Sequence, residues 1–401
     1  MADRSRRAPP LPRAVWTLGF VSLLMDLSSE TIHALLPVFL TTTLGASVSL
    51  VGLIDGASEA TASFAKFGSG VVSDRIGRRK PLILFGYGAA ALSKPLFAIA
   101  TGPAMVFAAR FADRLAKGVR GAPRDAMIAD VTDAAHRGRA FGLRQALDTA
   151  GAFAGPLAAI ALMALFSNDI RKVFMVAAVP GVLSALLVAF AVTETARGSL
   201  APTPSSRASL RADLARLDRK FWTLIAVGGA LTLARFSESF LILKATSSGL
   251  APGLSPAVLV VMNLAYGLGA YPAGRRSDRT PAWKMLALGA GALVLADLLL
   301  ATGGVAFALA GATLWGVHMA LTQGLIAKLV AASAPKDLRA TAFGVWHATA
   351  GVSIFAGSAI AGALWEAVDS RATFVAGAAM AAVTAVSAVA LLREGRPGPQ
   401  N

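Results

Sequence analysis

Long apolar segments follow one another through almost the whole chain, and they restrict it to one class of fold. Many of them contain 18 or more residues, which is long enough for a helix to cross a hydrocarbon layer of roughly 30 Å. Hydrophobic residues make up 55% of the chain and charged residues only 15%, whereas a soluble domain carries about 25% charged residues. The sequence therefore predicts an all-α polytopic membrane protein.

Positive charge is concentrated in connectors on one side of these segments. The net charge of +16 would suit a nucleic-acid partner, but its distribution excludes one. The basic connectors include Arg75–Lys80, Arg197–Lys220 and Arg275–Lys284, and the opposite connectors hold little beyond Arg171, Lys172 and Arg371. Because basic connectors face the cytoplasm, we expect a multi-pass protein of the bacterial cytoplasmic (inner) membrane with both termini in the cytoplasm.

The apolar segments predict twelve helices in two halves. The first six lie near residues 14–40, 49–73, 81–101, 104–123, 140–166 and 172–193, and the second six near 220–243, 254–273, 282–302, 304–332, 341–365 and 372–392. The polar stretch 195–219, with Pro202 and Pro204, predicts a cytoplasmic linker. The expected organisation is a first half at 1–194 and a second half at 220–401.

Short motifs repeat between these halves at a spacing of about 200 residues. Phe141-Gly142 and Phe153-Ala154-Gly155 recur as Phe343-Gly344 and Phe355-Ala356-Gly357, and Ser29-Glu30-Thr31 recurs as Ser237-Glu238-Ser239. Matches at a nearly constant spacing indicate an internal repeat of six helices.

The connector after the second segment carries the most specific motif. It reads Gly70-Val-Val-Ser-Asp74-Arg75-Ile-Gly77-Arg78-Arg79-Lys80, and its first part recurs as Gly274-Arg-Arg-Ser-Asp278-Arg279. The first copy resembles the loop signature of the major facilitator superfamily, G-x-x-x-D-[RK]-x-G-[RK]-[RK]. The resemblance implies twelve transmembrane helices in two pseudo-symmetric halves and a gating loop that latches them in the outward-facing state. A signal for membrane topology alone is the competing interpretation.

Two further motifs support the same resemblance. Arg114-Leu-Ala-Lys117-Gly118 resembles the superfamily motif R-x-x-Q-G, whose Arg is implicated in proton transfer in drug–proton antiporters. A structural network of Asp113, Arg114 and Asp125 is the alternative.

Gly151-Ala-Phe-Ala-Gly155-Pro156 resembles the antiporter motif G-x-x-x-G-P, which marks exporters. Small residues four apart also let a neighbouring helix approach closely, and Pro156 permits a bend.

Charged residues inside the predicted spans are candidates for the substrate and proton path, since such groups are costly in a membrane unless they are paired or functional. The path residues that we predict are Asp26, Glu30, Arg114, Arg235, Glu238 and His318. We assign Asp55 and Glu59 to structure rather than function, and Arg144 and Asp148, four residues apart on one helix face, to an internal salt bridge.

Enzymatic and metal chemistry are not indicated. The chain has no cysteine, and its four histidines lack the spacing of a metal site. A P-loop and a catalytic constellation are absent from the sequence, so we expect no cofactor, no metal and no enzymatic activity.

We therefore predict a secondary active transporter that works by alternating access, exchanges a small-molecule substrate against protons and functions as a monomer. Export is the expected direction. One alternative is a transporter of an anionic or metal-chelated metabolite, working inward or outward, with Arg235 and Lys244 as substrate ligands. The other is a receptor or assembly protein that transports nothing.

Overall fold

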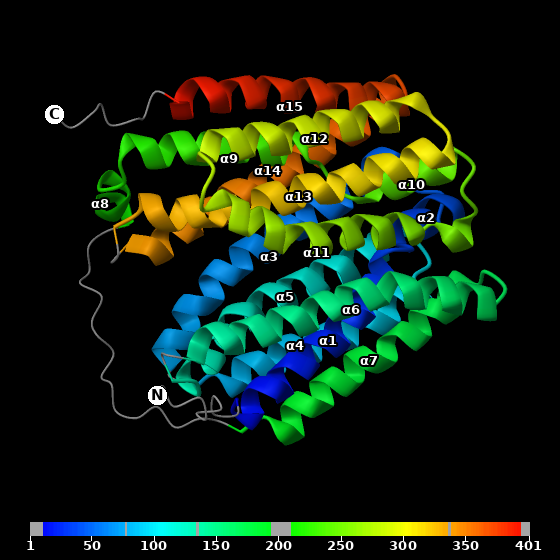
Figure 1. Cartoon of the computed structure of the whole chain (residues 1–401). Coiled ribbons are helices and arrows are strands. Elements are labelled where there is room, and N and C mark those ends of the chain that lie inside the picture. Colours follow the sequence, from blue (N-terminus) through cyan, green and yellow to red (C-terminus); the bar gives the residue numbers. More distant parts are fainter. Residues whose placement is uncertain (1–10, 77, 134–135, 194–209, 336–337, 394–401) are drawn as a thin grey trace, which may run out of the picture.

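The computed structural model describes residues 11–76, 78–133, 136–193, 210–335 and 338–393. Regular structure within these ranges is helical (Figure 1). The first half contains α1 (Arg13–His33), α2 (Leu36–Val38), η1 (Phe39–Thr43), α3 (Val48–Ile76), α4 (Lys80–Ile99), α5 (Pro103–Asp130), α6 (Arg137–Leu165) and α7 (Ile170–Ala191). After α8 (Leu210–Ala215), the second half contains α9 (Arg219–Ala234), α10 (Ser239–Ser247), η3 (Pro252–Leu254), α11 (Ala257–Ser277), α12 (Ala282–Thr302), α13 (Val305–Ser333), α14 (Arg339–Ala367) and α15 (Ser370–Arg393).

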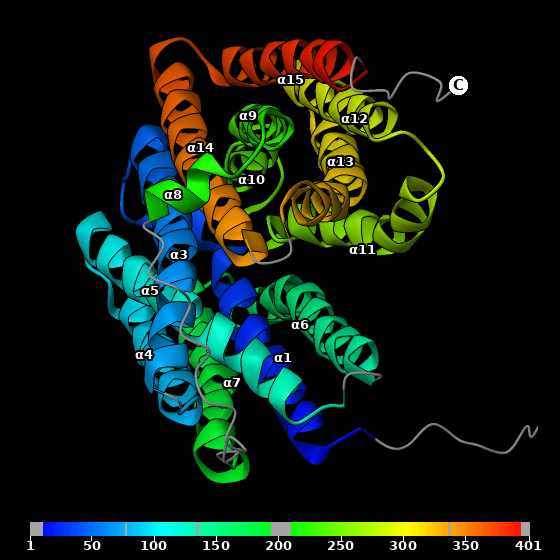
Figure 2. The same cartoon turned by 90° about the vertical axis from the view of Figure 1, so that its left-hand side faces the viewer.

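These helices form two bundles that lie against each other (Figure 2). In the first bundle α1 packs on α6 and α7, and α5 packs on α3 and α4. In the second, α13 packs on α11 and α12, and α15 packs on α12 and α9. Contacts between the bundles join α3 to α14 and α6 to α11.

The helices form twelve segments that can span a membrane. Ten segments of the described chain are long and apolar enough to cross a membrane. α3 and α5 complete the set, because they are as long as their neighbours and differ from them in carrying more charged side chains. Many of these side chains, including Asp55, Arg110 and Asp113, are buried inside the protein, as charges within a membrane must be unless they are paired or face water.

Two of the predicted helix boundaries are wrong. The fourth span does not end at Pro123, because α5 continues through this proline to Asp130; neighbouring helices can compensate the hydrogen bond that a proline removes. The seventh span is not one helix over 220–243, because α9 ends at Ala234 and α10 begins at Ser239. The interruption at residues 235–238 places non-helical backbone in the middle of the bundle.

Glycines set the close approach of the first and fifth spans, as the motif at Gly151 and Gly155 predicts. A Cβ atom built on Gly151 would lie 2.5 Å from the carbonyl oxygen of Leu23, and one on Gly155 would lie 2.6 Å from the Cβ atom of Glu30. The repeat has the same design, since a Cβ atom on Gly357 would lie 2.3 Å from the carbonyl oxygen of Leu233.

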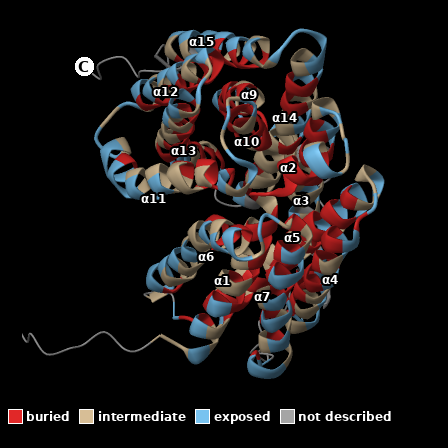
Figure 3. Ribbon diagram, turned by 90° about the vertical axis from the view of Figure 1, so that its right-hand side faces the viewer, coloured by how far each residue is buried: buried red, intermediate tan, exposed pale blue. Residues whose placement is uncertain are grey.

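The two bundles have different interiors. In the first, α5 carries buried charged residues, among them Arg110, Asp113 and Arg114. In the second, Phe236 forms the centre of an aromatic cluster, with ring centroids 5.3 Å from Phe240, 5.5 Å from Trp315 and 5.6 Å from Phe374. Figure 3 shows that the buried residues line the inner faces of the helices in both bundles.

Among the described residues, close contacts between the bundles begin at one end of the spans and continue to their middle. The first and last described residues, Leu11 and Arg393, lie at the same end of the spans as α8. We call this the terminal end, and we call the opposite end the far end. A Cβ atom on Gly52 would lie 2.5 Å from the carbonyl oxygen of Ser358, and one on Gly362 would lie 2.7 Å from the Cα atom of Ser49. These contacts all belong to the far halves of α3 and α14, and the helices diverge toward the terminal end (Figure 1).

Candidate functional site

Two adjoining cavities lie between the bundles. The first has a volume of about 310 Å³, and its charged and imidazole side chains are Glu30, His33, Asp55, Glu59, Arg110, Arg114, Lys117, Arg235 and Glu238. The second has a volume of about 300 Å³, and its charged lining consists of Asp26, Glu30, Lys66, Lys117, Arg120, Arg124, Asp125, Arg144 and Asp148. Glu30 and Lys117 belong to both, so the cavities meet at these two side chains.

Part of the first cavity is an ion-pair network of the first bundle. The Nη2 atom of Arg110 lies 2.7 Å from Nδ1 of His33 and 3.8 Å from Glu59, and its Nε atom lies 3.6 Å from Asp55. Arg114 places its Nε atom 3.2 Å from Oε1 of Glu59. Since both arginines are almost fully buried, these contacts hold them in the bundle.

Asp55 also connects the two bundles. One of its carboxylate oxygens accepts hydrogen bonds from the hydroxyl groups of Ser237, at 3.0 Å, and of Ser239. The amide of Ser237 in turn donates to the hydroxyl of Ser358 at 3.0 Å. The interruption of the seventh span is therefore tied to α3 and α14 at the floor of the cavity.

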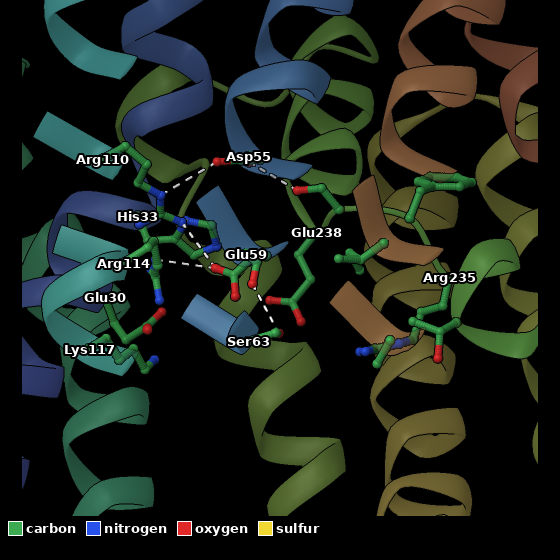
Figure 4. Close-up of a pocket in the computed structure, with 15 residues that line it drawn as sticks. Glu30, His33, Asp55, Glu59, Ser63, Arg110, Arg114, Lys117, Arg235 and Glu238 are labelled. Carbon is green, nitrogen blue, oxygen red and sulfur yellow. Dashed lines mark hydrogen bonds and ion pairs between the residues drawn. The ribbon is translucent and has the colours of Figure 1, made fainter. Parts of the chain in front are cut away.

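Four charged side chains that line the first cavity have no partner. Within the described residues, Glu30, Lys117, Arg235 and Glu238 form neither an ion pair nor a side-chain hydrogen bond, and all four remain partly exposed. Figure 4 shows Glu30, Arg114 and Lys117 on one side of the space and Arg235 on the other. Each bundle thus presents one unpaired carboxylate and one unpaired cation.

The second cavity leads from this site toward the terminal end. Its exposed lining residues are Lys66 and Gln145. Its wall contains the predicted internal salt bridge, which is confirmed, with Nη2 of Arg144 at 2.6 Å from Oδ2 of Asp148. Arg124 lies 3.8 Å from Asp148 and donates to Ser22 at 2.7 Å.

Most of the predicted path residues converge on this site. Glu30, Arg114, Arg235 and Glu238 line the first cavity, and Asp26 lines the second. The structure places elsewhere the sixth path residue, His318, and also Lys244, which the alternative interpretation predicts as a substrate ligand. His318 is buried on α13 with its Nδ1 atom 2.8 Å from the carbonyl oxygen of Gly289, and Lys244 donates to Ser370 at 3.0 Å. Neither is among the residues that line the two charged cavities.

The predicted gating loop can be followed only in part. Gly77 lies outside the described residues, and the side chains of Gly70, Asp74 and Arg75, at the end of α3, are likewise not described. Arg78 is exposed. Arg79 contacts Asp130 at the end of α5 at 2.5 Å and Ser73 on α3 at 3.1 Å. These contacts attach the loop to two helices of the first bundle.

The second copy of the loop is held in a similar way within its own bundle. Oδ1 of Asp278 lies 2.6 Å from Nζ of Lys328 on α13. Asp278 and Arg279 follow the end of α11 at the terminal end. Both sides of the Asp278–Lys328 pair are exposed to solvent.

Sequence reasoning missed two buried ionisable residues, Lys94 and Asp297. Lys94 on α4 and Asp113 on α5 form a buried salt bridge of 2.7 Å, and Lys94 also donates to Ser29 at 2.8 Å. Asp297 on α12 is fully buried, and neither of its carboxylate oxygens has a hydrogen-bond partner in the part of the chain that the structure describes. Single charges in apolar segments signal both groups.

No cluster of three or more His, Cys, Asp or Glu side chains placed to hold a metal ion occurs within the described ranges. The charged groups of the site instead suit reversible binding of a charged solute and of protons, because acids and bases alternate around a space that reaches solvent.

Comparisons with known proteins agree with this architecture. The chain is 28% identical over 389 residues to an uncharacterized MFS-type transporter of Methanocaldococcus jannaschii, covering 93% of this chain and 94% of the relative. It is 35% identical over 135 residues to a class C tetracycline resistance protein of Escherichia coli, which covers 34% of this chain and 33% of that protein.

Among solved structures, the nucleoside transporter NupG superposes with a TM-score of 0.77 at 14% identity, over 95% of this chain and 99% of that one. A bacterial homolog of the human lysosomal transporter Spinster, in an inward-facing and unoccupied conformation, superposes with a TM-score of 0.77 at 15% identity, over 98% of this chain and 100% of that one. The family model described as Major Facilitator Superfamily matches residues 18–262 and 239–401. The chain therefore belongs to the major facilitator superfamily and has its fold of twelve membrane-spanning helices.

Proposed function

We propose that this protein is a secondary active transporter that exports a small, hydrophilic, charged molecule from the cytoplasm in exchange for protons. The observation that carries the proposal is a set of charges, Glu30, Lys117, Arg235 and Glu238, that form no ion pair among the described residues. They line a cavity between two bundles whose closest contacts lie toward the far end. Alternating access requires such a site, located where the two repeats meet.

The terminal end is the cytoplasmic end in this proposal. The basic connectors Arg78–Lys80 and Arg275–Lys284 lie there, and basic connectors face the cytoplasm. The cavity in this conformation is then open to the cytoplasm through Lys66 and Gln145 and closed to the outside by α3 and α14. We assign the membrane to a bacterial cytoplasmic membrane on the same basis.

Glu30 and Glu238 are the proposed proton carriers. They occupy matching positions in the sequence repeat, and both line the first cavity without a cation partner among the described residues. A carboxylate in this setting can take up a proton when the cavity faces one side and release it when a cationic substrate group displaces the proton. Arg114 pairs with a third carboxylate of the cavity, that of Glu59, at 3.2 Å.

Export is supported by the Gly151–Gly155–Pro156 motif, which resembles that of antiporters, and by the similarity to a tetracycline resistance protein over about a third of the chain. The lining itself argues against a purely apolar substrate, since desolvating so many charges around one would be costly.

An anionic or metal-chelated substrate, carried inward, is the second candidate. Lys117 and Arg235 favour it, because they are unpaired cations on opposite bundles. Lys244 contributes nothing to it, since this side chain is held by Ser370 away from the cavities.

Purified protein in liposomes that contain a pH-sensitive dye tests the proposal. A panel of charged candidate substrates is added with and without a proton gradient, and wild type is compared with Glu30→Gln and with Asp133→Asn, which changes an exposed carboxylate outside the cavities. We expect substrate-dependent proton movement in wild type and in Asp133→Asn, and its loss in Glu30→Gln.

Other outcomes contradict the proposal in distinct ways. Substrate that crosses without proton movement excludes proton antiport. Proton movement that drives accumulation inside cells favours the anion importer. If no substrate produces flux and cells tolerate Glu30→Gln and Asp26→Asn without a phenotype, a non-transporting receptor is the better interpretation.

A further inference from the structure

Asp297 lies outside both charged cavities and is the most unusual ionisable group in the second bundle. It is fully buried on α12, and neither Oδ1 nor Oδ2 accepts a hydrogen bond within the described residues. An anion in that condition costs several kcal/mol in a membrane interior. The group must therefore either carry a proton or have a partner in another conformation.

Its location links it to the interrupted seventh span. A Cβ atom built on Gly377 of α15 would lie 2.7 Å from Oδ2 of Asp297 and 3.0 Å from the ring of Phe236, so the carboxyl group and this ring share one packed contact. Phe236 belongs to the interruption between α9 and α10, flanked by Arg235 and Ser237, and it lines the first cavity. Phe236 therefore lies between Asp297 on one side and the first cavity on the other.

The charged groups on the neighbouring elements do not neutralise Asp297. On α13, His318 bonds the carbonyl of Gly289, which lies two helical turns from Asp297 along α12. At the interruption, Arg235 and Glu238 face the cavity. Lys244 on α10 binds Ser370, and on α15 the described ionisable side chain, Arg371, belongs to the first turn. No ion pair to Asp297 exists within the described residues.

The corresponding position of the first bundle holds an ionisable side chain that is paired. Lys94 precedes Asp297 by nearly the spacing of the repeat, and a Cβ atom on Gly181 of α7 would lie 2.9 Å from Ser28 and 3.5 Å from Lys94. Lys94 is satisfied by Asp113 and Ser29. One bundle thus fills this position with a complete ion pair, and the other fills it with a carboxyl group alone.

Trp315 is a second buried polar group that contacts Phe236. Its Nε1 atom has no hydrogen-bond partner among the described residues, and its ring packs on Phe236 with centroids 5.5 Å apart. Movement of Phe236 with the interruption would change the surroundings of both groups together.

We propose that Asp297 is a second proton-binding site, separate from the cavity. It holds a proton on its carboxyl group in the present conformation and releases it to cavity water when the interruption at residues 235–238 rearranges. In that step one O–H bond breaks, the carboxylate keeps the electron pair, and the proton passes to water. A metal ion does not suit the site, because glycine and aromatic groups surround the carboxyl. The proposal extends the transport function, but its protonation can be tested without a substrate.

Infrared spectroscopy of full-length protein in lipid nanodiscs provides this test. Wild type is expected to show, at neutral pH, the C=O stretching band of a buried protonated carboxyl group. The band should be lost in Asp297→Asn and kept in the control Asp133→Asn. Spectra of wild type and Asp297→Asn that do not differ in this region would overturn the proposal.

Stability gives an independent check. Asparagine is close in shape to a protonated aspartic acid, so Asp297→Asn should fold and should unfold at the wild-type temperature at neutral pH. A variant that fails to fold would mean that the position needs a negative charge, which contradicts a bound proton.

The transport assay separates this proposal from the proposed function. Asp297→Asn should exchange labelled for unlabelled substrate like wild type but lose acceleration by a proton gradient. If gradient-driven transport is intact in Asp297→Asn and lost in Glu30→Gln, the result supports proton antiport and contradicts Asp297 as a second proton-binding site. If the infrared band is present but no proton movement accompanies transport, the result supports a protonated Asp297 and contradicts proton antiport.

Discussion

Replacing Gly52 with alanine should shift this protein away from the conformation described here. The new Cβ atom would lie 2.5 Å from the carbonyl oxygen of Ser358 and 2.9 Å from the ring of Phe240, and both belong to the opposite bundle. A backbone oxygen cannot move aside as a side chain does, so α3 and α14 must separate. The conformation in which the far ends are apart carries no such penalty.

The size of the shift follows from the cost of overpacking. An extra methyl group in a well-packed contact costs about 1–3 kcal/mol. A differential cost of this size changes the ratio of two conformations by a factor of about 5 to 150. Even the lower value is measurable when both conformations are populated.

Distances between spin labels at the far end report the ratio directly. The chain has no cysteine, so Thr101→Cys and Thr302→Cys, exposed residues of the two bundles, can be labelled without background. Gly52→Ala is expected to raise the population with the longer distance. Gly88→Ala is the matched control, because nothing lies within 4 Å of a Cβ atom at that helical position.

Identical distance distributions in wild type, Gly88→Ala and Gly52→Ala would refute the reasoning. They would mean that α3 and α14 are not in contact at the far end in the bilayer, or that the contact does not change between conformations.

Three smaller predictions concern stability, each measured as the unfolding temperature of purified protein. Lys94→Met removes the shorter of the two ion pairs that the buried Asp113 forms among the described residues and leaves the 3.9 Å contact to Arg114. It should lower the free energy of unfolding by about 3–5 kcal/mol, whereas the double variant Lys94→Met/Asp113→Leu should recover most of this loss; equal losses would contradict the pairing. Asp278→Asn removes an exposed salt bridge with Lys328 and should cost less than about 1 kcal/mol, so a large loss would reveal a further role for this motif. Asp218→Ala removes the N-cap hydrogen bond of α9 and should cost about 0.5–2 kcal/mol, while Asp218→Ser should cost much less.

Features that depend on local sequence were predictable. Twelve apolar segments, the repeat and the Arg144–Asp148 pair all depend on residues a few positions apart or on periodicity. The close packing around Gly151 and Gly155 was predictable too, because small residues four apart mark a contact face.

Features that depend on how the bundles pack were not. Asp55 was assigned to structure, but its hydrogen bonds to Ser237 and Ser239 of the opposite bundle join residues that only the assembled fold brings together. The sequence predicts His318 in the substrate path, but apolar residues are distributed around all sides of α13. Its sequence therefore does not reveal which face of the helix meets the cavity.

The interruption of the seventh span was also beyond sequence reasoning. Arg235-Phe-Ser-Glu238 contains neither Pro nor Gly, the usual signals of a break. The segment is held out of helical form by tertiary hydrogen bonds, such as that between Ser237 and Ser358. The local sequence therefore contains no signal from which this interruption could be predicted.

The contrast between the two interiors bears on how such a protein can acquire a new substrate. In the first bundle one substitution among the linked charges of α5 alters several ion pairs, so its effects spread and need compensation. In the second bundle Arg235 and Glu238 stand unpaired in front of the aromatic cluster around Phe236, and either can change without stranding a buried partner. Specificity can therefore change one residue at a time at the unpaired cations Lys117 and Arg235, whereas a change in the ion pairs of α5 needs a compensating substitution.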